Sequence, residues 1–240
     1  MSMLTLSIAP TLKTSFPSIM VQAFCVSGLR AAATAVEKQP VDFAKVGIEL
    51  AESGLSIQNL TEDLRIRGWR EAIAKCGLKP STFKTSAEQL VKRILAGSGI
   101  STPLPLVTGY CAISARHVAP LGAYDLARLP ARDIVLREAA HSDQFSPLGG
   151  RVQDMPLLPS VAVYAAGDVV MCYAFNHRDS STTCLTAETE DAVFIGEAVE
   201  LTHREPLQRA FEELRTWLER CGATLSPTVV CTGPRVAVQA

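Results

Sequence analysis

Helix-forming and strand-forming patterns occupy different parts of this sequence, and their separation is the feature that most constrains its fold. Two amphipathic helical patterns lie at residues 59–77 and 85–97, and each begins at polar capping residues and ends at a glycine. Short β-rich runs broken by Pro, Gly and Asp then dominate as far as about residue 204. This grouping favours an α+β fold, with a mixed β-sheet core and flanking helices, over a repeating βαβ fold.

The element boundaries follow from the same patterns. In NLTEDLRIRGWREAIAKCG either Asn59 or Thr61 is available as the N-cap, and in TSAEQLVKRILAG either Thr85 or Ser86 is. A third amphipathic helix is expected from Glu205 in EPLQRAFEELRTWLERCG. Strands are expected at residues 3–9, 18–28, 104–111, 133–139, 160–168, 169–175, 192–201 and 224–233.

We expect a single domain over residues 1–240. It divides into a helix-rich flank at about 30–100, a β-rich core at about 100–204, and a C-terminal helix and strand at 205–232. Of the 240 residues, 48% are hydrophobic and 20% are charged, so the chain can bury a large core and does not resemble a disordered segment.

Cysteine usage and hydropathy indicate a cytoplasmic protein outside the membrane. The seven cysteines are scattered and form no C-x-x-C pair, and the four histidines fall at no recognised metal spacing, so we expect neither a disulfide framework nor a metal site. No apolar run approaches the ~20 residues that cross a bilayer. The first 36 residues lack acidic side chains, as transit peptides do, but the alternation of Leu4, Leu6 and Ile8 favours a half-buried strand there.

The two helices at 59–97 enclose a basic cluster. Residues 65–93 contain eight basic and two acidic side chains, a local balance of +6 in a chain whose net charge is −1. Such a density can neutralise several phosphates of a nucleic acid. The alternative is a solvated helix pair whose counter-charges lie elsewhere in the fold. The candidate RNA-binding residues are Arg70, Lys79, Lys84, Lys92 and Arg93.

A dense polar run separates the strands at 169–175 and 192–201. The sequence NHRDSSTTCLTAETED holds more hydroxyl, amide and charged groups than a turn requires. The signatures of P-loops, dinucleotide-binding folds, α/β-hydrolases and zincins are missing from the chain. Hydroxyls and amides of this kind can hold a substrate or a water, or can instead satisfy backbone groups within a wide loop.

Five stretches together resemble the B3/B4 domain, the editing domain of the phenylalanyl-tRNA synthetase beta subunit, and in particular its freestanding relatives. These are RGWREAIAKCGLKPSTFKTSAEQLVKRIL, PLGAYDLARL, DIVLREA, VYAAGDVVMCYAFNHRDSSTTCLTAET and FIGEAVEL. The resemblance covers roughly residues 5–232. It implies an aminoacyl-tRNA deacylase that acts in trans on mischarged tRNA, needs neither metal nor cofactor, and binds the aminoacylated 3′ end of tRNA.

The resemblance also assigns roles to single residues. Asn176 and Arg178 match a W-N-x-R motif of freestanding relatives, with Phe175 in place of the tryptophan, and Glu197 falls where the synthetase has a glutamate that recognises the tyrosine hydroxyl. An exposed strand glutamate is the alternative for Glu197, because an unpaired buried carboxylate is costly. The candidate catalytic residues are Asn176, Arg178, Thr183 and Glu197. The candidate substrate-binding residues are Phe175, Ser180, Thr182, Gly122 and Tyr124.

The sequence departs from the family at one position of the expected pocket. Where the synthetase motif G-Q-P-L-H-A-F-D has a histidine, this chain reads VAPLGAYD, with Gly122 at that position and Tyr124 beside it. We expect the missing side chain to enlarge or re-purpose the pocket, so the amino acid recognised need not be tyrosine.

Three functions therefore remain open. The first is a stand-alone deacylase, and the second is an RNA-binding module that retains the basic surface without the chemistry. The third is an enzyme of small-molecule metabolism that reuses the pocket, and in one version Cys184 acts as a nucleophile whose pKa is lowered by Arg178 or His177.

Overall fold

The structure is a computed structural model that describes residues 3–38 and 40–239. Within those residues the strands form two sheets rather than one, a division that the sequence patterns did not predict. The first sheet has the order β11 (Val236–Gln239), β1 (Met3–Ile8), β4 (Asp133–Glu138), β5 (Ala162–Ala166), β6 (Val169–Tyr173), β7 (Arg178–Asp179). The second has the order β10 (Val229–Cys231), β2 (Met20–Ser27), β8 (Ala192–Ala198), β3 (Gly122–Asp125), and β9 (Thr224–Leu225) also pairs with β2.

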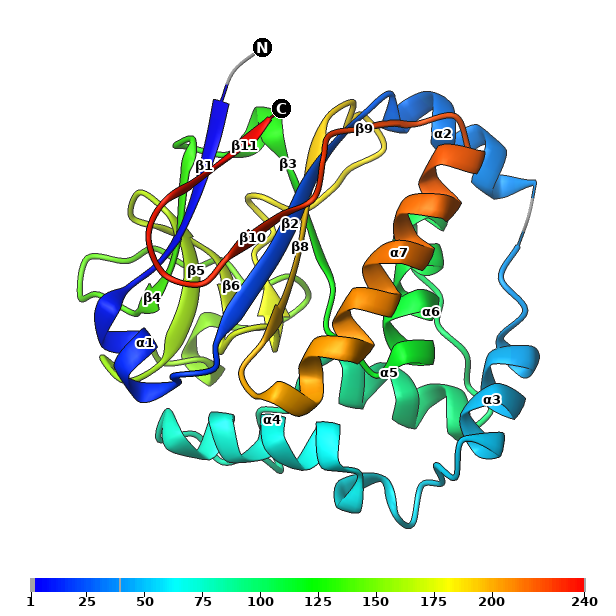
Figure 1. Cartoon of the computed structure of the whole chain (residues 1–240), viewed down its shortest axis with the longest axis horizontal. Helices are drawn as coiled ribbons and strands as arrows, with labels where there is room; N and C mark the ends of the chain where they lie inside the picture. The colour runs from blue at the N-terminus through cyan, green and yellow to red at the C-terminus, as the bar shows by residue number, and fades with distance from the viewer. Residues whose placement is uncertain (1–2, 39, 240) are drawn as a thin grey trace.

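The predicted α+β class with a mixed sheet is confirmed. In the first sheet β1 and β4 are parallel, whereas the other pairings of the two sheets are antiparallel. The sheets enclose one hydrophobic core, to which Leu4 and Leu6 contribute from β1 and Val21 and Ala23 from β2. Figure 1 shows the first sheet on the left, β2 and β8 crossing the centre, and α6 and α7 beyond them on the right.

Helices cover the outer face of the second sheet and form a separate cluster beneath it. The helices are α1 (Pro10–Ser15), α2 (Leu29–Glu37), α3 (Phe43–Glu52), α4 (Leu64–Lys75), α5 (Ser86–Leu95), α6 (Pro105–His117) and α7 (Arg204–Arg220). Phe24 of β2 and Phe194 of β8 point outward and pack with Phe211 of α7 and Tyr110 of α6. Because side chains alternate along a strand, Val193, Ile195 and Glu197 of β8 point the other way, into the space between the sheets.

The prediction of a strand at 104–111 is wrong, because these residues form the N-cap and first half of α6. Pro105 occupies the first turn of this helix, where its missing N–H costs nothing. Leu106, Gly109 and Tyr110 are buried, and the half-buried Val107 and Cys111 between and beside them are also apolar, so the segment resembles a buried strand in sequence. Gly109 is required by the packing, since a Cβ there would lie 2.4 Å from the Trp217 ring of α7.

Other boundaries are confirmed or shifted by short distances. Thr85 caps α5 as predicted, with its Oγ1 accepting from the Glu88 N–H at 3.2 Å, whereas α4 is capped by Asp63 rather than by Asn59 or Thr61. The strands at 3–9, 18–28, 133–139, 160–168, 169–175 and 192–201 and the C-terminal helix are confirmed. The last predicted strand is interrupted around Pro227 and becomes β9 and β10, while β11 was not predicted. None of the helices in the described ranges is long and apolar enough to span a bilayer.

Candidate active site

A small cavity lies between the two sheets where β3, β5, β6, β7 and β8 approach the start of α5. Its polar lining consists of Ser86, Tyr124, Tyr164, Asn176, Asp179 and Glu197, and its apolar lining includes Gly122, Phe175 and Ile195. Its volume of about 20 Å³ is room for one water molecule. Of the candidate site residues, it brings together Asn176, Glu197, Gly122, Phe175 and Tyr124.

A tight turn after β6 directs Asn176 into this cavity. Ala174 and Phe175 both have positive φ, at +51° and +62°, a conformation that costs non-glycine residues about 1–3 kcal/mol each. Packing holds the turn in place, because the buried Phe175 ring meets the rings of Phe16 at 5.4 Å and Trp69 at 5.6 Å. Backbone strain supported in this way is often found at functional sites.

Asn176 links the turn to α5 and to β8. Its Nδ2 donates to Oε1 of Glu197 at 2.6 Å, and its Oδ1 accepts from the Ser86 N–H at 3.3 Å. The Asn176 backbone carbonyl also accepts from the Ser86 N–H, at 3.1 Å. The amide is therefore fixed at both ends, which holds the Glu197 carboxylate in one position.

Glu197 is a buried carboxyl with partners on both oxygens, so the exposed-strand alternative is wrong. Only 2% of the residue is exposed, and its Oε2 accepts from the Tyr164 hydroxyl at 3.0 Å. Burial raises the pKa of Glu197 to about 7, against the lowering effect of the hydrogen bonds from Asn176 and Tyr164. Near neutral pH both protonation states are populated, as a group that exchanges protons with a reactant requires.

A second carboxyl lines the same cavity. The Tyr124 hydroxyl donates to Oδ1 of Asp179 at 3.1 Å, and burial raises the pKa of Asp179 although this hydrogen bond opposes the shift. A Cβ added at Gly122 would lie 2.7 Å from the Tyr124 hydroxyl oxygen. The space left by the absence of a side chain at Gly122 is thus filled by Tyr124, so the pocket is not enlarged there, and of the two expectations only a re-purposed pocket remains.

The remaining polar candidates of the loop lie outside the cavity lining. Arg178 precedes Asp179 on β7 and donates from Nη1 to the Leu148 carbonyl at 3.3 Å. Ser180 and Thr182 bond each other through their hydroxyls at 2.7 Å. Thr183 is fully buried, and its hydroxyl has no partner within residues 3–38 and 40–239. For Ser180 and Thr182 this geometry agrees with the alternative that loop hydroxyls satisfy local groups.

Sequence reasoning missed three polar residues of the cavity. Asp179 follows Arg178 in the loop, and strand alternation was the available signal that one of the two would point inward. Tyr164 lies on β5, far from the loop in sequence, and nothing in its surroundings indicated that it faces Glu197. The Ser86 hydroxyl oxygen is buried and has no partner within the described part of the chain.

Cys184 does not have the environment of a nucleophile. Its Sγ lies 3.5 Å from the Ser181 carbonyl, and burial raises the pKa of its thiol although the nearby Arg128 acts to lower it. A raised pKa disfavours the reactive thiolate. Across residues 3–38 and 40–239, no group of three or more His, Cys, Asp or Glu side chains is placed to hold a metal ion.

The basic loop between α4 and α5 packs directly against the site turn. Lys79 is exposed and Lys84 is half-buried, and the Lys84 carbonyl lies 2.6 Å from Nδ1 of His177. Lys92 and Arg93 are exposed on α5. Arg70 forms an ion pair at 2.7 Å with the buried Glu88.

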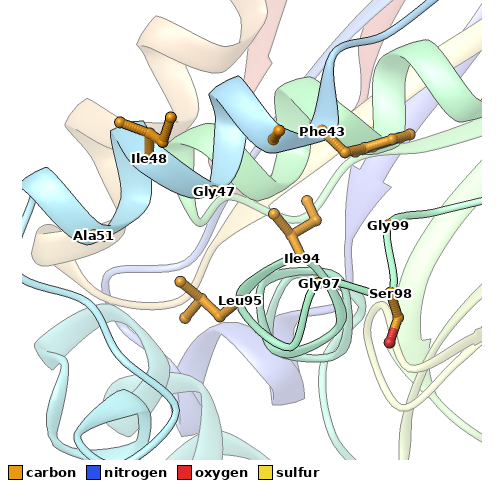
Figure 2. Close-up of a pocket in the computed structure, with 10 residues that line it drawn as sticks. Phe43, Gly47, Ile48, Ala51, Ile94, Leu95, Gly97, Ser98 and Gly99 are labelled. Carbon is orange, nitrogen blue, oxygen red and sulfur yellow. The ribbon is translucent and has the colours of Figure 1, made fainter.

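A second concavity lies between α3 and α5 (Figure 2). It has a volume of about 490 Å³, and the side chains of Ile48, Ile94 and Leu95 border it. Its lining contains no ionisable side chain. This groove therefore offers apolar contact but no acid–base chemistry, unlike the cavity that holds Glu197.

Fold and cavity together define a two-sheet α+β domain whose buried pocket is lined by two carboxyls. The model of the B3/4 domain family matches residues 68–210, and the chain belongs to that family. In structure it is similar to an N-terminal fragment of the phenylalanyl-tRNA synthetase beta subunit from Pyrococcus horikoshii, with a TM-score of 0.51 and 13% identity over 98% of this chain. The chain spans about half of that fragment, namely 54% of its length. No curated protein sequence matches.

Proposed function

We propose that the chain is an aminoacyl-tRNA deacylase that acts in trans and hydrolyses the ester bond of mischarged tRNA. Membership of the B3/4 domain family and the likeness to a phenylalanyl-tRNA synthetase beta-subunit fragment support a role on tRNA. The observation that carries the hydrolytic step is Glu197, a carboxyl with a pKa of about 7 that Asn176 holds at the wall of a small cavity.

The proposed reaction uses groups that line the cavity. A water attacks the ester carbonyl carbon, and its proton passes to the Glu197 carboxylate as the new C–O bond forms. The Ser86 hydroxyl, which has no other partner within the described residues, donates to the oxyanion of the tetrahedral intermediate. The bond to the ribose oxygen then breaks, and that oxygen takes the proton from Glu197. Asn176 orients the carboxylate throughout.

The basic residues next to the site turn are the proposed contact for the acceptor end of tRNA. Lys79 and Lys84 lie in the loop that is bonded to the turn, and Lys92 and Arg93 follow on α5. A helix rises 1.5 Å per residue, so Lys92 lies about 9 Å along the axis from Ser86. Phosphates bound there would bring the 3′ end close to the cavity. Arg70 has a smaller role in this proposal, because Glu88 already pairs with it.

The size of the cavity favours one other function. A pocket with room for a single water leaves little space for an amino acid, as expected of an RNA-binding module that has lost the chemistry. Such a module would bind tRNA through the same basic residues and release no amino acid.

The test is a deacylation screen against tRNAs charged correctly and incorrectly. We expect selective release of an amino acid, reduced about 10²-fold or more in Glu197→Gln and in Asn176→Ala. The matched control is Glu188→Gln, which makes the same chemical change at an exposed glutamate outside the cavity. Full activity in Glu197→Gln would refute the proposed base, and tRNA binding without any release would favour the non-catalytic module.

RNA binding is tested separately with neutralising variants. Lys79→Gln combined with Lys84→Gln should weaken tRNA binding and reduce the slope of log K against log salt by about one unit per lost phosphate contact. Arg220→Gln, at the exposed end of α7, is the control. An equal effect of the control would indicate a general charge effect rather than a binding surface.

A further inference from the structure

We propose that this pocket accepts only amino acids whose side chain is no larger than a hydroxymethyl group, and that Tyr124 sets this limit. The inference rests on the proposed function, since it names the substrate class of the same site. It identifies glycine, alanine and serine as the class that fits, and it excludes aromatic and branched side chains.

The volume of the cavity is the first support. About 20 Å³ accommodates a methyl or hydroxymethyl group in the position of one water, whereas an aromatic ring needs several times that space. Protein interiors are closely packed and resist the insertion of additional carbon atoms. A larger side chain therefore requires a wall of the pocket to move.

Tyr124 is the wall that fills the space beside Gly122. Its hydroxyl oxygen lies 2.7 Å from the position of a Gly122 Cβ and donates to Asp179 at 3.1 Å. Residues two apart on a strand face the same side, which explains why Tyr124 reaches the space that Gly122 leaves open. The residue is 2% exposed, so its ring is buried among neighbours rather than turned toward solvent.

The backbone on both sides of Tyr124 keeps this wall in place. The residue pairs with Val193 on β8 and forms an isolated antiparallel bridge with Cys184 on its other side. The pocket is thus bounded by a strand that is paired along both edges at this position, and not by a loose loop. Tyr124 therefore sets a fixed limit on side-chain size and does not act as a gate.

Tyr164 lines the same cavity from β5, and its hydroxyl occupies the Glu197 oxygen to which the phenol of a tyrosine substrate would donate. Its hydroxyl donates to Oε2 of Glu197 at 3.0 Å, and Asn176 donates to Oε1. A substrate phenol that took the place of Tyr164 would leave a buried hydroxyl without a partner. The chain thus supplies from its own strand the hydroxyl that a tyrosine substrate would bring.

The experiment uses one tRNA that a ribozyme charges in turn with glycine, alanine, serine, leucine, phenylalanine or tyrosine, so that tRNA identity is constant. Wild type should hydrolyse the esters of the three small amino acids with kcat/KM at least about 10²-fold above those of the two aromatic ones. Tyr124→Ala should reduce this ratio at least about tenfold, and Tyr124→Phe, which keeps the ring, should preserve it. A preference of wild type for aromatic esters would overturn the proposal.

Binding of non-hydrolysable 3′-aminoacylamido-adenosines, measured by calorimetry, separates this inference from the proposed function. If no ester is hydrolysed but the alanyl analogue binds more tightly than the tyrosyl analogue, the deacylase function fails and the size limit stands. Equal affinity for the two analogues, or no binding of either, overturns the size limit. If melting shows that Tyr124→Ala is unfolded, Tyr124→Leu replaces it, and an unchanged ratio in a folded variant also refutes the role of Tyr124.

Discussion

Replacing Glu197 with glutamine should change how the stability of the protein depends on pH. The Glu197 carboxyl has a pKa of about 7 in the folded chain, against 4.5 for an ordinary glutamate, because burial disfavours its charged form. Between those two values the folded state binds more protons than the unfolded state. The stabilising contribution of this group is therefore fully present below about pH 4.5 and is lost as the pH rises to about 7.

The size of the effect follows from the two pKa values. A tenfold change in a proton-dissociation constant corresponds to about 1.4 kcal/mol. The titration of Glu197 therefore lowers the free energy of unfolding by roughly 3 kcal/mol as the pH rises from about 4.5 to about 7. Glutamine is nearly isosteric and does not titrate, and its side-chain oxygen can still accept from Asn176. The stability of Glu197→Gln relative to wild type should therefore rise by roughly 3 kcal/mol between pH 4.5 and pH 8.

Urea unfolding monitored by tryptophan fluorescence at half-unit pH intervals measures this difference. Trp69 lies in the core next to Phe175 and reports on the region around the site. Comparing the two proteins at each pH cancels the titration of other groups. A difference that stays constant from pH 4.5 to pH 8 would show that Glu197 titrates normally and would refute the reasoning.

Three further predictions concern packing, capping and acid stability. Gly109→Ala places a methyl group 2.4 Å from the Trp217 ring and should destabilise the fold by about 1–3 kcal/mol, measured by urea unfolding, so an unchanged midpoint would contradict the tight contact between α6 and α7. Thr85→Ala removes the acceptor for the Glu88 N–H and should cost about 1 kcal/mol in the same assay, whereas Thr85→Ser should retain most of that stability. Burial lowers the pKa of His203 from 6.5 to about 4, so the free energy of unfolding falls as the pH falls through this interval. His203→Gln should reduce that loss by roughly 3 kcal/mol. If the variant and the wild type lost the same stability between pH 6.5 and pH 4, the lowered pKa of His203 would be contradicted.

Elements with one buried face were predictable from the sequence. β1 and α7 each alternate or repeat their apolar residues with the period of the structure they form, so their boundaries follow from pattern alone. α6 was not predictable in this way, because it is enclosed by other helices and carries apolar residues on nearly every side. The interruption around Pro227 and the pairing of β11 with β1 depend on contacts between the two ends of the chain.

The candidate site likewise contains residues that were predictable from the sequence and residues that were not. Asn176 and Glu197 were predicted from the residues and from the family resemblance, because each lies in a recognisable local motif. Asp179, Tyr164 and Ser86 join them only because strands and a helix from distant parts of the chain meet at the cavity. Their positions depend on strand register, and a shift of one residue would turn every side chain of a strand to the opposite face.

The sequence by itself determined the α+β class, the basic character of the 65–93 segment and the polar loop that contains Asn176, since each is a local property of composition or period. Only the tertiary structure decided how large the pocket is. In the sequence Gly122 predicts empty space, yet Tyr124 shares its face of β3 and folds back over it. A cavity is the volume that all neighbouring side chains leave unfilled, and that volume exists only once the strands are paired and the two sheets are packed.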